Sequence, residues 1–115
     1  MMTILEMYEK VSLRLPIEQR RFFNYLNDSV REIESLYSSF GHLVFLRDKE
    51  FQPIKSLQDE NVVRALYHEA IVDNITFLAG GDAAYKAEFA RKAEAAWLKY
   101  WNDQAKGRHT LRVRM

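Results

Sequence analysis

The sequence predicts an all-α fold: a small bundle of three long helices with a short N-terminal helix, an irregular loop or small hairpin, and an extended C-terminal arm. Apolar residues recur every three or four positions through most of the chain, which is the spacing of one helix face. Glycine and proline are scarce, four and two among 115 residues, and they fall between the periodic segments. From Arg108 to Met115 the apolar residues instead alternate, which is the period of a strand.

Composition is that of one ordinary soluble domain, with 48% apolar and 29% charged residues. The absence of cysteine excludes a disulfide framework, a thiol nucleophile and a cysteine metal site. No apolar run approaches the roughly 18 residues of a membrane span, and the start "MMTILEMYEK" does not resemble a signal peptide. We therefore expect a product of the cytosol with no membrane partner.

Two helices are predicted in the first 40 residues. In the segment 3–15, Thr3 is the N-cap candidate and Glu6 stands at the capping-box spacing. In the segment 16–40, Pro16 suits a first helical position, and Gly41 ends the helix. The second helix has one apolar face, formed by Phe22, Leu26, Val30, Ile33, Tyr37 and Phe40.

Residues 42–57 break the helical period, and we interpret them as an irregular loop or a small hairpin. Loops of this length in compact domains are often functional. The candidate contact residues in it are Phe45, Arg47, Asp48, Lys49 and Phe51.

The segment 56–81 predicts a second long helix, with Ser56 or Asp59 as its cap and a glycine pair to close it. Its core face comprises Val63, Leu66, Tyr67, Ala70, Ile71, Asn74, Ile75 and Leu78. The segment 82–106 predicts a third, capped by Asp82, rich in alanine and lined by Tyr85, Phe89, Ala93, Trp97 and Trp101. Residues 1–105 would thus form a helical domain, and residues 106–115 a basic arm.

The arm differs in charge from the rest of the chain. Net charge is +1, but four of the 17 bases lie in the last ten residues, so residues 1–105 hold 13 bases against 16 acids. A single short strand is unstable alone in water, so the arm is disordered, folds back, or adds to the sheet of a partner. The residues assigned to partner binding are Arg108, Thr110, Leu111, Arg112, Val113 and Arg114.

The sequence contains no recognisable catalytic motif. No histidine pair has metal-ligand spacing, and "AGGD" lacks the strand and lysine of a phosphate loop. We interpret His68 and Glu69 as a pair on a helix surface. The expectation is a protein that is not an enzyme and that uses no metal or cofactor.

Two further features allow more than one interpretation. Asp73 and Asn74 interrupt an apolar helix; they form a polar site, or Asp73 lies at the edge of the buried stripe, where it could face a neighbouring subunit, and Asn74 bonds to the loop. Trp97, Tyr100 and Trp101 are core residues, stack on bases, or extend into a subunit contact, where such residues are enriched.

The order of these elements resembles that of the head–tail connector (adaptor) proteins of tailed bacteriophages. The resemblance rests on the long "FFNYLNDSVREIESLY" helix, an irregular insert, a helix pair joined by Gly80, Gly81 and Asp82, and a basic arm. It includes no invariant motif.

The resemblance implies a structural virion protein that forms a homo-oligomeric ring, typically of twelve subunits, beneath the portal. Such a ring extends the DNA channel without binding DNA specifically and receives the next neck or tail protein. The arm would grip the portal, and the loop 42–57 would contact the neck partner or an adjacent subunit. The expected location is the virion neck, assembled in the host cytoplasm, in an adaptor, stopper or tail-completion role. The alternative is a small helical nucleic-acid-binding regulator that uses the basic arm.

Overall fold

The computed structural model describes the backbone of residues 2–37 and 53–114, and side chains as far as Asp103. Its elements are α1 (Ile4–Arg14), α2 (Gln19–Tyr37), the 3-10 helix η2 (Ala65–Tyr67), α3 (His68–Leu78) and α4 (Ala83–Arg114). Within these described residues the fold is a small all-helical bundle, so the predicted fold class is confirmed. Two of the helices are long, α2 and α4, whereas α1 and α3 have 11 residues each.

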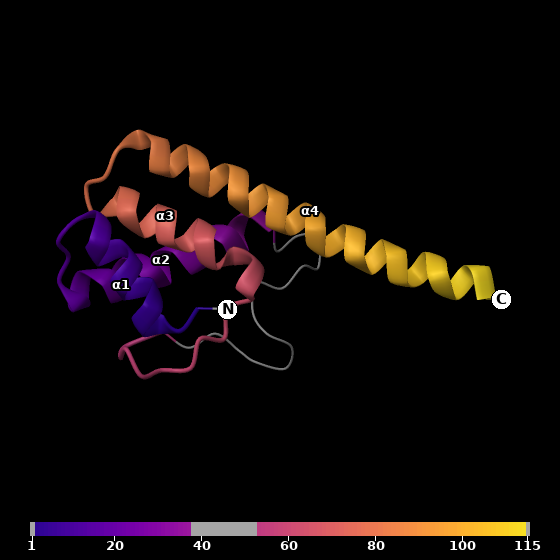
Figure 1. Cartoon of the computed structure of the whole chain (residues 1–115), viewed down its shortest axis with the longest axis horizontal. Coiled ribbons are helices and arrows are strands. Elements are labelled where there is room, and N and C mark those ends of the chain that lie inside the picture. Colours follow the sequence, from indigo (N-terminus) through magenta and orange to yellow (C-terminus); the bar gives the residue numbers. More distant parts are fainter. Residues whose placement is uncertain (1, 38–52, 115) are drawn as a thin grey trace.

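Helix α3 lies at the centre of the bundle and packs against α1, α2 and α4. Figure 1 shows α4 running alongside α3 and then continuing well beyond the other helices, with the C-terminus at its far end. The molecule is accordingly elongated, measuring 55 × 29 × 23 Å along its principal axes.

The core lies where α1, α2 and α4 meet α3. The predicted apolar faces are confirmed at their central positions, which are fully or almost fully buried: Phe22, Leu26, Val30, Ile33, Val63, Tyr67, Ala70, Ile71, Ile75, Phe89 and Ala93. From α1, Ile4, Met7 and Val11 join the same cluster. Because α3 is enclosed by helices, it buries residues nearly all round and includes polar ones.

The start of α1 is as predicted, but α2 starts later. Thr3 Oγ1 accepts a hydrogen bond from Glu6 N, and Glu6 Oε1 accepts one from Thr3 N, which is a complete capping box. Helix α2 begins at Gln19, three residues after the predicted Pro16. In the connection, Tyr8 Oη donates to the Ile17 carbonyl at 3.1 Å. The Tyr8 hydroxyl thus supplies the hydrogen bond that the Ile17 carbonyl would receive from a backbone N–H if the helix began at Pro16.

The prediction of a long helix from residue 56 is wrong for its first part, because residues 53–64 are irregular and the helical residues begin at Ala65. Polar side chains explain this difference. Asp59 Oδ2 accepts hydrogen bonds from Lys55 N and Ser56 N, and Asn61 Oδ1 accepts one from Val63 N. Side chains of this kind compete with helical hydrogen bonding for the backbone donors.

The turn between α3 and α4 satisfies both helix ends. Gly80 N donates to the Phe77 carbonyl and Gly81 N to the Thr76 carbonyl, which are the two bonds of a Schellman motif. Gly80 has a φ of 112°, which L side chains rarely adopt. Asp82 Oδ1 accepts a hydrogen bond from Ala84 N at 2.8 Å, so the predicted cap of α4 is confirmed.

Helix α4 is longer than predicted and continues to Arg114, across the segment for which the sequence predicts an extended arm. The side chains beyond Asp103 lie outside the description, so the partner-binding arm stays a prediction. A helix that is already formed adds one backbone hydrogen bond for each residue it fixes, whereas an isolated strand has none of its own.

Candidate functional site

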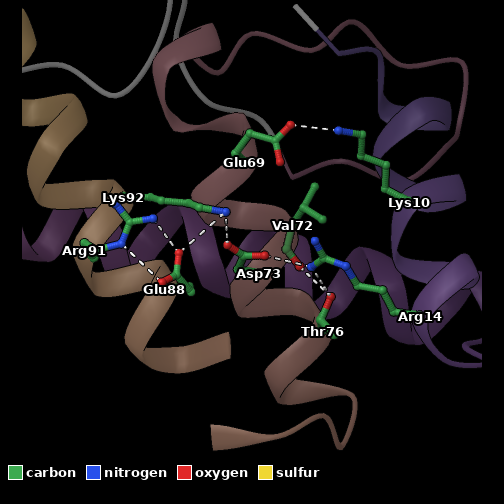
Figure 2. Close-up of polar contacts among 9 residues, drawn as sticks. All are labelled: Lys10, Arg14, Glu69, Val72, Asp73, Thr76, Glu88, Arg91 and Lys92. Atoms are coloured by element: carbon green, nitrogen blue, oxygen red, sulfur yellow. Dashed lines mark hydrogen bonds and ion pairs between the residues drawn. The ribbon is translucent and has the colours of Figure 1, made fainter. Parts of the chain in front are cut away.

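The most concentrated polar feature of the bundle is a carboxylate of α3 held between two cations. Asp73 is 2% exposed, yet Arg14 Nη1 of α1 lies 2.7 Å from its Oδ1 and Lys92 Nζ of α4 lies 2.6 Å from its Oδ2. We call these three residues the Asp73 cluster; Figure 2 shows the two cations approaching the carboxylate from opposite sides. Both oxygens of a buried charge are thus compensated within the chain.

Neighbouring groups orient both cations. Arg14 Nη1 also donates to Thr76 Oγ1 at 3.2 Å, and its guanidinium lies 4.9 Å from the centre of the Tyr85 ring. Lys92 Nζ lies 3.9 Å from Glu88 Oε2. The hydrogen bonds from Arg91 to Glu88 lower the pKa of that carboxyl, so Glu88 stays ionised beside Lys92.

The position of Asp73 differs from both interpretations that place it at a surface. It is neither at the edge of the buried stripe nor on a face open to a neighbouring subunit, because α1 and α4 cover it. Both oxygens of the Asp73 carboxylate are engaged by side chains of the chain itself, so the carboxylate is not presented to a ligand. The Asp73 cluster therefore connects three helices, and its arrangement is that of a structural ion-pair network.

A second polar cluster begins at the next residue of α3. Asn74 Nδ2 donates to Ser29 Oγ of α2 at 2.9 Å, and Asn74 Oδ1 accepts from Lys86 Nζ of α4 at 3.0 Å. Lys86 also pairs with Glu32 of α2. Asn74 thus bonds to two helices, and the predicted hydrogen bond to the loop is not observed.

His68 is a position that sequence reasoning placed wrongly, because it does not lie on a helix surface. It is 1% exposed, while Glu69 is exposed and pairs with Lys10 of α1 at 2.8 Å (Figure 2). Burial lowers the pKa of His68. His68 lies at the junction of η2 and α3, and helical periodicity does not indicate that its side chain is buried there.

The aromatic residues of α4 gather where this helix leaves the bundle. Trp97 stacks on Tyr37 of α2 with ring centres 5.4 Å apart, and Tyr100 meets Trp101 edge to face at 5.7 Å. Arg64 lies 5.1 Å from the centre of the Tyr100 ring. All three predicted residues, Trp97, Tyr100 and Trp101, are partly buried.

The other predicted contact residues cannot be placed. Phe45, Arg47, Asp48, Lys49 and Phe51 lie outside the described residues, and the side chains of the arm, from Arg108 to Arg114, are likewise outside the description. The structure brings Asp73 toward α4, but it joins none of the predicted site residues into a reaction centre within the described part of the chain.

Two pockets border the segment 53–61. One pocket, of about 560 Å³, lies between the start of α2 and residues 53–55. Its Asn27 amide is already bonded to both Ile54 N and Ile54 O. The other, of about 390 Å³, is bordered by Met2, Thr3 and residues 59–61. Among the described residues no group of three or more His, Cys, Asp or Glu could hold a metal ion.

Comparison with known proteins identified no relative: no family model, no curated protein and no solved structure matches this chain. Among the described residues, none of the helices has the length and apolar character needed to cross a membrane.

Proposed function

We propose that this chain is a structural, non-enzymatic subunit of a bacteriophage head–tail connector, in which copies form a ring beneath the portal and receive the next neck protein. The proposal starts from the resemblance of element order, helix texture and basic C-terminal segment to such adaptors. In this role the chain provides a stiff body and surfaces for several partners, with DNA passing through the ring without specific binding.

One observation carries the proposal: α4 continues beyond the bundle and ends in a basic sequence. At 1.5 Å per residue, its 32 residues span about 48 Å, far more than α3 needs for packing. Lys106, Arg108, Arg112 and Arg114 lie in this projecting part, and no acid follows Asp103. A projecting basic helix end fits an acidic surface on the portal.

The two polar clusters supply the stiffness that such a subunit needs. Each joins α3 to two other helices through charged or amide groups with short contacts. Buried polar networks that are fully satisfied favour one arrangement of the elements. In the proposed ring, the partly buried Trp97, Tyr100 and Trp101 contribute to the subunit contact.

The test is association with the portal protein encoded by the same genome, measured by size-exclusion chromatography with light scattering. We expect the full chain to associate weakly alone and to form a large complex with the portal. The variant R112E/R114E should lose the complex. Lys99→Glu, which makes the same kind of charge change at an exposed position within α4, should retain it.

A tight dimer that forms no complex with the portal would contradict the proposal. A complex of the same size formed by the R112E/R114E variant would also contradict it. The genome offers a simpler check, because a portal gene just upstream is expected.

The alternative, a nucleic-acid-binding regulator, is favoured by the same four bases. Cations in the described part of α4 weigh against it, since Lys86, Arg91 and Lys92 are each paired with a carboxylate. A gel shift with duplex DNA at low salt that weakens steeply as salt rises would favour the regulator.

A further inference from the structure

The segment before α1 is attached to the bundle by two side chains that bind one residue from opposite sides. Met2 N donates to His68 Nδ1 at 3.1 Å, and Met2 O accepts from Asn61 Nδ2 at 2.8 Å. Both polar groups of the Met2 backbone are thus satisfied by residues about 60 positions away. We call Met2, Asn61 and His68 the N-terminal clasp.

These contacts require one protonation state of His68. Its Nε2 lies 2.8 Å from the Val63 carbonyl, and a carbonyl only accepts, so Nε2 carries the proton. Nδ1 must then be unprotonated to accept from Met2 N. The ring is therefore neutral, and both of its nitrogens are engaged.

A second proton on the ring would break the clasp. Protonated Nδ1 becomes a donor and faces the Met2 N–H, which is also a donor, so the hydrogen bond turns into a repulsive contact. The ring is also 1% exposed, and a buried imidazolium without an anionic partner is unfavourable. Moving Met2 away admits water to Nδ1 and relieves both problems.

The charges around the ring are few. Glu69 favours the protonated ring and the N-terminal amine disfavours it, and burial is the larger influence, so the pKa of His68 is lowered. Lys10 of α1 partly offsets Glu69, because the two form an ion pair. Glu60 and Arg64 are the charged residues of the 60–67 segment that precedes the ring.

We propose that the N-terminal clasp is a pH-sensitive latch, in which protonation of His68 at Nδ1 releases residues 2–3 while the helical bundle stays folded. Release removes Met2 from the border of the 390 Å³ pocket that it shares with residues 59–61. The latch is independent of the proposed connector role.

The test is a pH titration of the full chain from pH 8 to pH 5 by nuclear magnetic resonance. Long-range proton–nitrogen spectra report the tautomer and charge of each histidine, and His68→Gln assigns the signal. We expect the Nε2–H tautomer at pH 8. The amides of Met2 and Thr3 should lose protection in step with the His68 titration, while those of Ile71 and Ile75 stay protected.

Asn61→Ala provides a second check, because it removes the hydrogen bond to Met2 O and leaves both ring nitrogens of His68 with their own partners. It also removes the bond from Val63 N, so the Nε2–H tautomer of the variant is verified in the same spectra. We expect His68 in this variant to titrate closer to the ordinary value of 6.5. A double variant, H42Q/H109Q, should behave as the unaltered chain. The latch is refuted if Met2 and Thr3 are unchanged while His68 titrates, if they are released while His68 stays neutral, or if the α3 amides lose protection in the same step.

Discussion

At the scale of single residues, two adjacent positions of α3 bond to different pairs of helices. Asp73 is bonded to α1 and α4, and Asn74 is bonded to α2 and α4. Neither assignment follows from helical periodicity, which treats a polar residue on an apolar helix as an interruption. The partners Arg14 and Lys92 are distant in sequence, and only the packing of three helices brings them together.

Replacing Asp73 should cost much more stability than replacing its exposed neighbour. Asp73→Asn removes the carboxylate partner of Arg14 and leaves Lys92 only its longer contact with Glu88. Because both cations are about one-third exposed, we expect a loss of about 2 kcal/mol in the free energy of unfolding. Glu69→Gln breaks a pair whose side chains are half exposed and should cost less than about 1 kcal/mol. Urea unfolding measures both, and equal losses would contradict the role given to the Asp73 cluster.

The buried His68 should make stability depend on pH. Its pKa is lowered in the folded chain relative to the ordinary value of 6.5, so the unfolded chain binds the proton first as the pH falls. Stability from this group is present above pH 6.5 and is lost as the pH falls from 6.5 through the lower folded-state pKa. Urea midpoints from pH 8 to pH 5.5 should decrease accordingly, and this decrease should be smaller in His68→Gln. An unchanged decrease would assign it to other groups.

At the scale of elements, the sequence was most informative about apolar faces and caps, and least informative about where helices begin and end. The Thr3 and Asp82 caps and the buried rows of α2 and α4 follow local rules, because each depends on residues within one or two turns. Helix α3 starts late because side chains of the preceding segment bond to its backbone N–H groups, and these bonds compete with helical hydrogen bonding.

The α3–α4 turn should be sensitive to a single methyl group. A Cβ at Gly81 would lie 2.7 Å from the Thr76 carbonyl oxygen, which is backbone and cannot move alone. We expect Gly81→Ala to cost about 2 kcal/mol or more. At Gly80 nothing lies within 4 Å, so Gly80→Ala should cost about 1 kcal/mol through its positive φ alone. Thermal unfolding of the two variants tests this order.

At the scale of the whole molecule, the buried core and the projecting end of α4 are separate in sequence. The buried apolar residues among those described lie between Ile4 and Ala96. Truncation after residue 105 removes none of them. The free energy of unfolding, measured with urea, should therefore change by about 0.5 kcal/mol or less. Under the connector proposal, the truncated chain should nonetheless fail to bind the portal. Loss of the fold itself would show that the distal part of α4 belongs to the bundle.

The central place of α3 has a consequence for the order in which the chain assembles. Each outer helix packs against α3, so none of the three helix contacts can form before α3 is in place. We therefore expect α3 to be docked in the folding transition state. Ile71→Val in α3 should therefore slow refolding, whereas Ile4→Val in α1, an identical change at an equally buried site, should mainly accelerate unfolding. We therefore expect the outer helices to detach first and to return last, with α3 as the surface on which they reassemble.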